Sequence, residues 1–186
     1  MRKNFGIKPW LYPMPVLIVC AYDKDGMPNC MNAAWGGMAE ENLITICLDN
    51  SHKTTKNIEI SKAFTVSVGT AKTVVPCDYV GIASGNDVQD KMEKANFTTS
   101  QSEFVNAPII NELPFTLECK LISYNNQNCT LIGEIINISA DQSILDDKGK
   151  IDVNKLQPIS YDPINHTYCR LGEVVGFAFK DGLKIK

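Results

Sequence analysis

The stretch Val16-Leu-Ile-Val-Cys-Ala-Tyr-Asp-Lys-Asp-Gly-Met-Pro-Asn-Cys-Met-Asn-Ala-Ala-Trp35 decides the fold. Its first seven residues, Val16 to Tyr22, form a short apolar run rich in β-branched side chains, which predicts a buried strand. Asp23-Lys-Asp-Gly26 then provides a turn, because glycine adopts positive φ without steric cost. Asn29 to Trp35 continues as the partner strand, and Gly36-Gly37 ends it. We therefore expect a β-hairpin.

Outward from this hairpin, strand patterns outnumber helical ones. Further strands are predicted at 43–48, 63–68, 115–124 and 129–140, short helices at 55–62, 74–84 and 88–95, and an irregular stretch at 97–113. Thr54 or Thr55 is the expected N-cap of the first helix. The helices occur as insertions, without the regular strand–helix alternation of a parallel sheet. The pattern favours a mainly β protein whose six or seven strands close into a small Greek-key barrel.

The composition limits the class of protein. The 186 residues suit one domain, 1–186, and the net charge of −3 provides no basic surface for nucleic acid. The longest apolar run has seven residues, which is the length of a strand and too short to span a membrane. No apolar segment follows the charged first residues, so no secretory signal peptide is expected. Seven cysteines, an odd number without CxxC spacing, argue against a disulfide framework or a zinc ribbon. These features together predict a cytoplasmic protein.

The first candidate for chemistry lies in the hairpin itself, at Asn29 to Trp35. Ala33 and Ala34 are small enough for a flat ring to approach the backbone, and Asn32 offers a donor and an acceptor to a heteroaromatic edge. Trp35 can form a wall of such a site. The alternative is an ordinary strand with Trp35 in the core, which composition alone favours.

The second candidate is Asn50-Ser-His-Lys-Thr-Thr55, immediately before a predicted helix. Hydroxyl groups, the cation of Lys53 and the free N–H groups of a helix N-terminus together suit a terminal phosphate. The alternative is a capped helix with a solvated lysine. The glycines of a Walker loop are missing.

The third candidate is Asp78 to Asp87 with Lys91. Gly81, Ser84 and Gly85 permit close backbone approach, and Lys91 can place a positive charge beside a reduced flavin, which raises its potential. A helix C-cap with a surface lysine is the equally simple alternative.

His52 and His166 have no acid or cysteine at ligand spacing, so no metal site is expected. The sequence also lacks a GxGxxG loop, so a Rossmann-type dinucleotide site is not expected.

In this order, the three clusters resemble the flavin reductase-like, flavoredoxin family of FMN-binding split barrels. The matching stretches are Pro13–Val16, Gly26–Trp35, Ser51–Thr54 with Asn57-Ile58, Phe64–Val66, Gly81–Gly85, Lys91 and Tyr168–Phe179. The resemblance covers nearly the whole chain. It implies a six-stranded FMN-binding split β-barrel with Greek-key topology, working as a homodimer with FMN near the interface.

The resemblance also implies a set of cofactor-binding residues. Asn32, Ala33, Ala34 and Trp35 would face the ring and ribityl chain, with Cys47, Leu48 and Asp49 beside them. Ser51, His52, Lys53 and Thr54 would hold the phosphate, Lys91 would reach the ring or the phosphate, and Tyr168 would close the site. Gly85 also belongs to the implied cofactor-binding set. No catalytic residue is assigned, because the flavin itself performs the redox steps.

Two functions stay open at this point. One is a reductase that uses NAD(P)H to reduce flavin, as cofactor or substrate. The other is an electron carrier that exchanges electrons through bound FMN with a redox protein. A barrel that binds a small ligand without redox chemistry is disfavoured by the combined phosphate and ring clusters. Fold alone does not choose among them.

Overall fold

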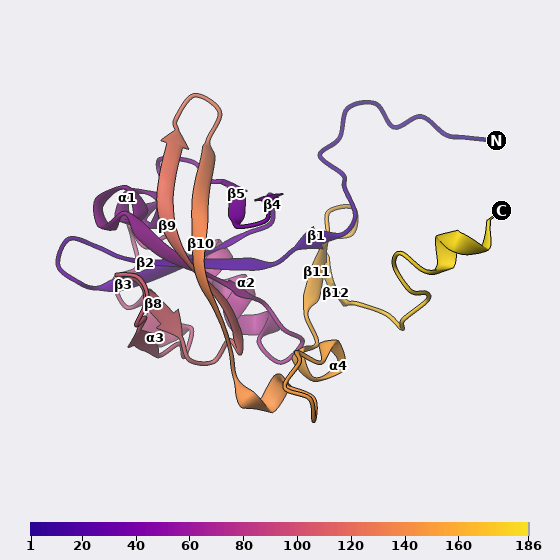
Figure 1. Ribbon diagram of the computed structural model, residues 1–186. Helices are drawn as coiled ribbons and strands as arrows, with labels where there is room; N and C mark the ends of the chain where they lie inside the picture. The colour runs from indigo at the N-terminus through magenta and orange to yellow at the C-terminus, as the bar shows by residue number, and fades with distance from the viewer. Residues whose placement is uncertain (186) are drawn as a thin grey trace.

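The protein is described by a computed structural model over residues 1–185; Lys186, the last residue of the predicted domain, lies outside this part. Its main sheet is antiparallel throughout and contains seven strands (Figure 1). From one edge to the other they are β3 (Pro28–Ala33), β2 (Leu17–Tyr22), β6 (Ala63–Val68), β9 (Phe115–Asn125), β10 (Thr130–Ala140), β5 (Leu43–Cys47) and β4 (Gly36–Glu40).

The sheet is strongly curled, and the chain connectivity explains why. The edge strands β3 and β4 are joined by only two residues, Ala34 and Trp35. Consecutive Cα atoms are about 3.8 Å apart, so the two edges must approach each other and the sheet bends into a half-barrel. This confirms the predicted fold class. The seventh strand, β4, was expected as a glycine break, and it forms because Gly36 and Gly37 pair with Ile46 and Thr45 of β5.

The remaining elements are short. A three-stranded sheet contains β1 (Met14–Pro15), β11 (Ile159–Asp162) and β12 (Thr167–Arg170), and β7 (Thr99–Gln101) pairs with β8 (Pro108–Ile110). The helices are α1 (Lys53–Ser61), α2 (Val74–Ile82), α3 (Lys91–Lys94) and α4 (Val153–Leu156), with 3₁₀ turns η1 (Gln142–Ile144) and η2 (Asp181–Lys184). The helix expected over 88–95 is therefore a single turn, and the stretch 97–113 contains a small hairpin. Within residues 1–185 no helix has the length and apolar character that crossing a membrane requires.

Helix α1 begins differently from the sequence expectation. His52 occupies the N-cap position and makes no side-chain cap hydrogen bond, so the predicted cap at Thr54 or Thr55 is wrong. Both threonines are buried inside the first turn of the helix. The Thr54 hydroxyl instead accepts a hydrogen bond from the Asn29 side chain on β3.

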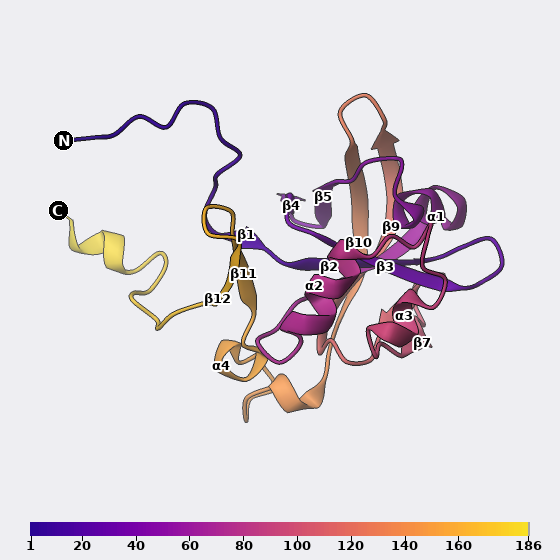
Figure 2. The ribbon, with the colours of Figure 1, turned by 180° about the vertical axis from the view of Figure 1, so that it is seen from behind.

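Both faces of the sheet are covered. The concave face holds an apolar cluster centred on Phe64, Ile46 and Leu131, whereas Ile18, Cys20 and Cys30 point to the opposite face and pack under α2. Figure 2 shows α2 lying across that back face. Strand β2 is therefore buried on both sides, as its continuous apolar run predicted.

The turn between β2 and β3 sets which groups of β3 face outward. The Asp23 N–H donates to the Met27 carbonyl at 2.9 Å, and Gly26 has φ +77°. Hydrogen-bonded and non-hydrogen-bonded pairs alternate along an antiparallel ladder, so Cys20–Cys30 and Ile18–Asn32 are non-hydrogen-bonded pairs. The backbone N–H and C=O groups of Cys30 and Asn32 consequently point away from β2, to the free edge of the sheet beside α2.

A buried polar row lies on the outer face beneath the segment 102–110. Glu118 is 1% exposed; it accepts a hydrogen bond from the Ser102 hydroxyl and another, of 2.7 Å, from the Asn137 amide. Next to it, the Thr65 hydroxyl donates to the Pro108 carbonyl at 2.6 Å. These bonds fasten the segment that follows α3 to the sheet.

The structure predicts which thiols react. Cys20, Cys30, Cys77 and Cys119 are fully buried, and burial raises the pKa of Cys77 to about 11 and that of Cys119 to about 12. Cys47 and Cys129 are partly exposed and Cys169 is exposed. Because the thiolate is the reactive form, a colorimetric thiol reagent should label Cys169 first, and the four buried thiols only after denaturant is added. Mass spectrometry of the labelled peptides checks this, and rapid labelling of Cys20 or Cys30 in the folded protein would contradict it.

Candidate functional site

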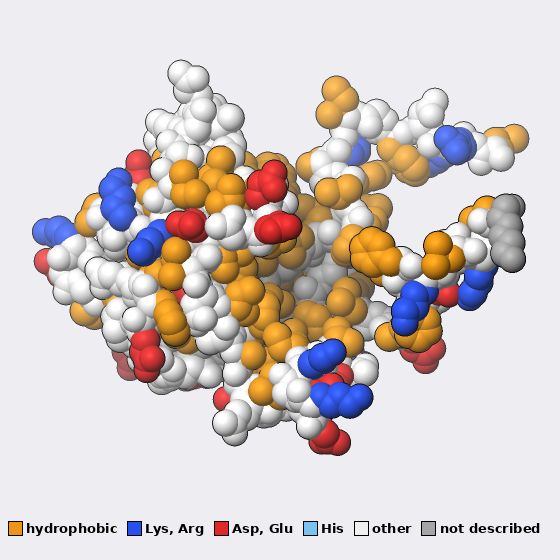
Figure 3. Space-filling model, in the orientation of Figure 1, with side chains coloured by type: hydrophobic (Ala, Val, Ile, Leu, Met, Phe, Trp, Pro, Cys, Tyr) orange, Lys and Arg blue, Asp and Glu red, His pale blue; other side chains and the backbone are white. Residues whose placement is uncertain are grey.

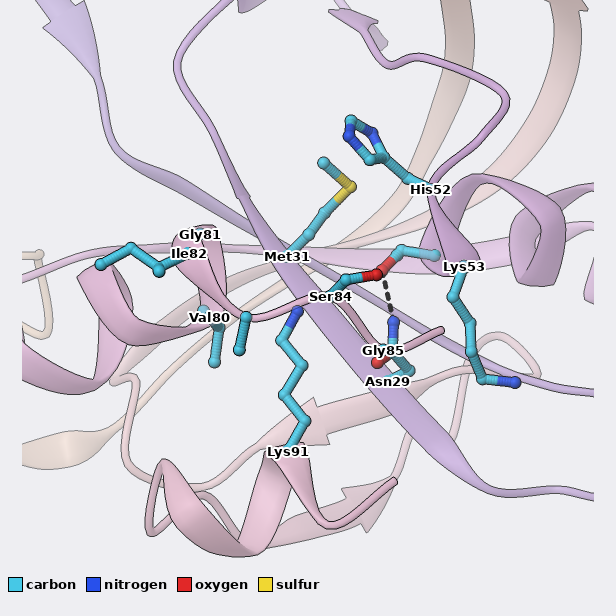
Figure 4. A pocket seen from close by; sticks show the side chains of 12 residues that line it. Asn29, Met31, His52, Lys53, Val80, Gly81, Ile82, Ser84, Gly85 and Lys91 are labelled. Carbon is cyan, nitrogen blue, oxygen red and sulfur yellow. Dashed lines mark hydrogen bonds between the residues drawn. The ribbon is translucent and has the colours of Figure 1, made fainter. Parts of the chain in front are cut away.

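The candidate site is a cavity at the free edge of β3, of about 140 Å³. Three further segments meet β3 there, namely the start of α1, the end of α2 and the single turn of α3 (Figure 4). The lining residues are Asn29, Met31, His52, Lys53, Thr54, Val80, Gly81, Ile82, Ala83, Ser84, Gly85 and Lys91. Ligand pockets of drug-sized molecules are roughly 300–1,000 Å³, so this cavity encloses only part of such a ligand.

A buried hydrogen bond connects the segments around the cavity. The side-chain amide of Asn29 donates to the Thr54 hydroxyl at 2.6 Å, which joins β3 to α1 (Figure 4). On its other side Asn29 packs against Gly85, where an added Cβ would lie 2.1 Å from the Asn29 Oδ1. Gly85 is thus required for close packing of the α2–α3 connection on β3.

Replacing Gly85 by alanine should therefore displace Asn29 and break its bond to Thr54. We expect a loss of about 1–3 kcal/mol in the free energy of unfolding, measured by chemical denaturation. Gly37→Ala is the matched control, because a Cβ at Gly37 meets nothing within 4 Å. Equal stability of the two variants would contradict the packing role of Gly85.

Lys91 provides a buried positive charge at the cavity. Its side chain reaches from α3 to the cavity between Val80 and Ser84 (Figure 4) and the residue is only 3% exposed. In residues 1–185 it forms no salt bridge, since the four ion pairs found there involve other lysines. Burial lowers the pKa of Lys91. A buried ammonium without a carboxylate is costly, so its position indicates an anionic or strongly polar ligand group.

A second positive region lies at the start of α1. This nine-residue helix has neither a side-chain cap nor an acidic residue in its first turn, so its first N–H groups are available to an anion. Lys53 stands beside them, with its Nζ 3.1 Å from the Asp23 carboxylate. Burial alone would raise the pKa of the Asp23 carboxyl. Hydrogen bonds from the Met27 N–H, the Lys53 ammonium and the Asp25 N–H have the larger combined effect, so the pKa of Asp23 is lowered. Figure 4 shows the Lys53 ammonium directed away from the cavity centre, to the side of this partner.

The structure gathers five of the residues implied by the family resemblance. His52, Lys53, Thr54, Gly85 and Lys91 line one cavity, although they come from three separate parts of the chain. The sequence clusters before α1 and after α2 therefore meet in space.

The hairpin cluster is only partly at this cavity. Asn32 lies beside it, with its amide donating to the Cys77 carbonyl at 3.0 Å, and Ala33 points to the concave core. Ala34 and Trp35 line a separate hollow against the N-terminal segment. Trp35 is 57% exposed, so it is not a core residue.

The remaining implied residues lie outside the cavity lining. Leu48 is buried in the concave core, and the Cys47 N–H donates to the Trp35 carbonyl at 2.8 Å. Asp49 accepts a hydrogen bond from the Ser51 N–H at 2.8 Å on the exposed surface.

Tyr168 packs behind α2 and donates to Asp78 at 2.7 Å. Burial and then this hydrogen bond raise the pKa of its phenol. Tyr168 therefore supports the helix whose end lines the cavity.

Seven of the twelve lining residues were absent from the implied set of cofactor-binding residues, and four of the seven are informative. Asn29 and Met31 alternate with Cys30 on β3, and Val80 and Ile82 belong to α2. Asn29 begins the hairpin cluster 29–35 that the sequence singled out, but it was not among the implied cofactor-binding residues. Only the hairpin register places its side chain against Thr54. No group of three potential metal ligands occurs in the part of the chain described.

Comparison with known proteins identifies the family of this chain. Residues 10–163 match the flavin reductase like domain. The chain is 35% identical to the flavoredoxin of Desulfovibrio vulgaris (Miyazaki F), with a TM-score of 0.93 over 98% of this chain and 100% of that one. It is 27% identical to the flavoredoxin from Methanosarcina acetivorans, with a TM-score of 0.89 over the full length of both.

A third structure supports the fold alone. It is an FMN-binding domain of a flavin reductases-like enzyme from Shewanella baltica OS155, with a TM-score of 0.78, 24% identity and 88% of each chain covered. The sequence match over residues 10–163 and the 35% identical flavoredoxin structure together show that this chain belongs to the flavin reductase-like domain family.

Proposed function

We propose that this protein binds FMN at the β3 edge and acts as a flavoredoxin-type oxidoreductase that carries electrons through it. The observation that carries the proposal is Lys91, a buried ammonium without an ion-pair partner in the described chain, facing the cavity. The start of α1 and Lys53 provide a second positive region. Two positive regions beside one cavity suit a ligand with a phosphate and an electron-accepting ring.

The donor set of the site fits FMN. The uncapped start of α1, Lys53 and Thr54 would hold the phosphate. The outward backbone groups of Cys30 and Asn32, and the ammonium of Lys91, would pair with the polar edge of the ring. The apolar side chains of Met31 and Val80 would cover part of the ring. FMN, when bound, supplies one-electron and two-electron transfer, and a nearby cation raises its reduction potential.

An absorption titration tests the proposal directly. The protein is mixed with FMN, freed of excess ligand by gel filtration, and examined for a retained flavin spectrum and for the FMN-to-chain ratio. We expect one FMN per chain. A protein that retains no flavin, and does not change the fluorescence of added FMN, would refute the proposal.

The phosphate assignment has its own test at Lys53. Lys53→Ala should weaken FMN binding by about 1.5–3 kcal/mol, because a charge-assisted hydrogen bond to the phosphate is lost. Riboflavin lacks the phosphate and is the matched ligand, so its dissociation constant should be the same for both proteins. Equal loss of affinity for FMN and riboflavin would contradict a phosphate contact.

The alternative role is an NAD(P)H-dependent flavin reductase that uses FMN as its substrate. The family match to a flavin reductase like domain favours this role, whereas the high similarity to two flavoredoxins favours the carrier. Under anaerobic conditions, rapid bleaching of the flavin by NADH or NADPH would establish the reductase. Bleaching only by dithionite or a reduced redox protein would establish the carrier.

A further inference from the structure

Two cysteines face each other across the first hairpin of the sheet. Cys20 on β2 and Cys30 on β3 are register partners, and both are 0% exposed. They form a non-hydrogen-bonded pair, in which the two Cα atoms lie about 4.5 Å apart. A disulfide spans Cα separations of about 4.4–6.8 Å, so this pair can be oxidised without rearranging the strands.

The two thiols share their surroundings with one positive charge. They pack in the apolar cluster under α2, which also contains Cys77 and Val80. Burial, and then the neighbouring Cys30 thiol, raise the pKa of Cys20, whereas the Lys91 ammonium acts in the opposite direction. Burial lowers the pKa of Lys91, and the two thiols oppose that change. Lys91 therefore lies close to both thiols, and a cation beside a thiol favours the thiolate, which is the reactive form.

The pair is closed to bulk solvent but lies next to the cavity. Figure 3 shows exposed hydrophobic side chains gathered on the front of the body, whereas Cys20 and Cys30 lie on the opposite face, under the helix that crosses the back in Figure 2. Lys91 lines the cavity and is also close to the thiols (Figure 4). Strand β3 is the edge strand beside the cavity, and β2 lies behind it. Cys30 is therefore the nearer thiol to the cavity.

We propose that Cys20 and Cys30 are a redox-active dithiol that reduces a small peroxide entering through the cavity and closes to a cross-strand disulfide. The Cys30 thiolate attacks one oxygen of hydrogen peroxide and the O–O bond breaks. The sulfur becomes a sulfenic acid, and the leaving hydroxide takes up the thiol proton as water. The Cys20 thiol then attacks the sulfenic sulfur, the S–O bond breaks, and a second water leaves with the Cys20 proton. Two electrons pass from the two sulfurs to the peroxide.

The size of the cavity favours a small oxidant. It measures about 140 Å³ and leads to thiols with no exposed surface, so hydrogen peroxide can reach them where a bulky organic disulfide cannot. Reduced flavins release hydrogen peroxide when they react with dioxygen, so bound FMN would generate this oxidant at the same cavity. Only that source of peroxide rests on the proposed function, and the thiol chemistry does not.

Peptide mapping of the full chain without FMN tests the proposal. The protein is treated with hydrogen peroxide, denatured, alkylated and cleaved with trypsin, which cuts after Lys24, between the two cysteines. We expect two peptides joined by a Cys20–Cys30 disulfide, and both thiols again after dithiothreitol. Cys77 and Cys119 are equally buried and should remain alkylated. Alkylation of Cys20 and Cys30 to the same extent as Cys77 would overturn the proposal, and so would a disulfide between Cys30 and Cys77.

Alanine variants test the order of the two steps. Cys20→Ala should stop at the sulfenic acid of Cys30, which dimedone traps, whereas Cys30→Ala should leave Cys20 unmodified over the same time. Cys77→Ala is the matched control for the loss of a buried thiol in the same cluster and should form the disulfide at the parent rate. Dimedone labelling at Cys20 alone would contradict the assignment of Cys30 as the attacking thiol.

The role of the ammonium has a separate readout. Lys91→Met should slow disulfide formation roughly tenfold, because a nearby opposite charge changes the thiolate fraction by about that factor or more. Lys94→Met is the control, since Lys94 is exposed and paired with Asp90. Equal rates in the two variants would contradict the role of Lys91. None of these measurements requires FMN, so a failure of this proposal is distinguishable from a failure of FMN binding.

Discussion

Glu118→Ala is expected to lower the free energy of unfolding by about 3–5 kcal/mol, the largest effect predicted for this protein. The change removes the acceptor for the hydroxyl of Ser102, at the start of the segment 102–110, and for the side-chain amide of Asn137 on β10. The buried Ser102 hydroxyl left without its acceptor costs about 1–3 kcal/mol, the half-buried Asn137 amide costs less, and the cavity of the missing side chain adds to this. Chemical denaturation followed by circular dichroism measures the loss.

Glu118→Gln is the control that isolates hydrogen bonding from size. The glutamine carbonyl can accept from Ser102, and Asn137 can turn its amide so that its carbonyl accepts from the glutamine. We expect a cost of about 1 kcal/mol or less for this variant. If the alanine and glutamine variants unfold at the same denaturant concentration, the hydrogen bonds of Glu118 do not stabilise the fold.

Lys91→Met is expected to weaken FMN binding by roughly 10–150-fold. A hydrogen bond from a charged donor contributes about 1.5–3 kcal/mol, which corresponds to that range in the dissociation constant. Methionine keeps the length and apolar stem of lysine, so the cavity wall is preserved. Isothermal titration of FMN into parent and variant gives the two constants.

Three comparisons sharpen the Lys91 test. Lys94→Met, on the same turn of helix but exposed and paired with Asp90 at 3.0 Å, should bind FMN like the parent. Riboflavin affinity should fall with FMN affinity if Lys91 contacts the ring, and stay constant if it contacts the phosphate. The free variant should be at least as stable as the parent, because a buried unpaired charge is removed. An unchanged dissociation constant for both ligands would contradict a ligand role for Lys91.

The sequence predicted the main strands because their signals are local. The run Val16 to Tyr22 reads as a buried strand from its own residues, and Ala63 to Val68 from its apolar pattern, and both strands occur within a residue of the expected bounds. The missed elements depend on tertiary contacts. Strand β4 forms because β5 is there to pair with it, since Gly36-Gly37 has little strand preference of its own.

Several individual residues of the candidate site could be predicted from the sequence, but the contacts that bring them together could not. Lys53 and Thr54 in the first turn of α1, and Gly85 and Lys91 after α2, could be predicted because their residue types alone indicate anion binding or close backbone approach. Asn29 could not, because its role arises from the hairpin register that directs it to Thr54. The contact of Tyr168 was equally unpredictable, since nothing in the sequence indicates that Asp78 accepts a hydrogen bond from its hydroxyl behind α2.

The turn Asp23-Lys-Asp-Gly26 also makes the site sensitive to chain length. Adding one residue there would shift β3 by one position against β2, and every side chain of β3 would exchange faces. Asn29 would leave Thr54, and the outward backbone groups would turn to β2. By the same rule, an added residue in the Asn125–Asn128 turn would shift β10 against β9, but no residue of that turn or of β10 lines the cavity. The register between β2 and β3, rather than the fold alone, therefore decides whether the polar groups around the cavity meet.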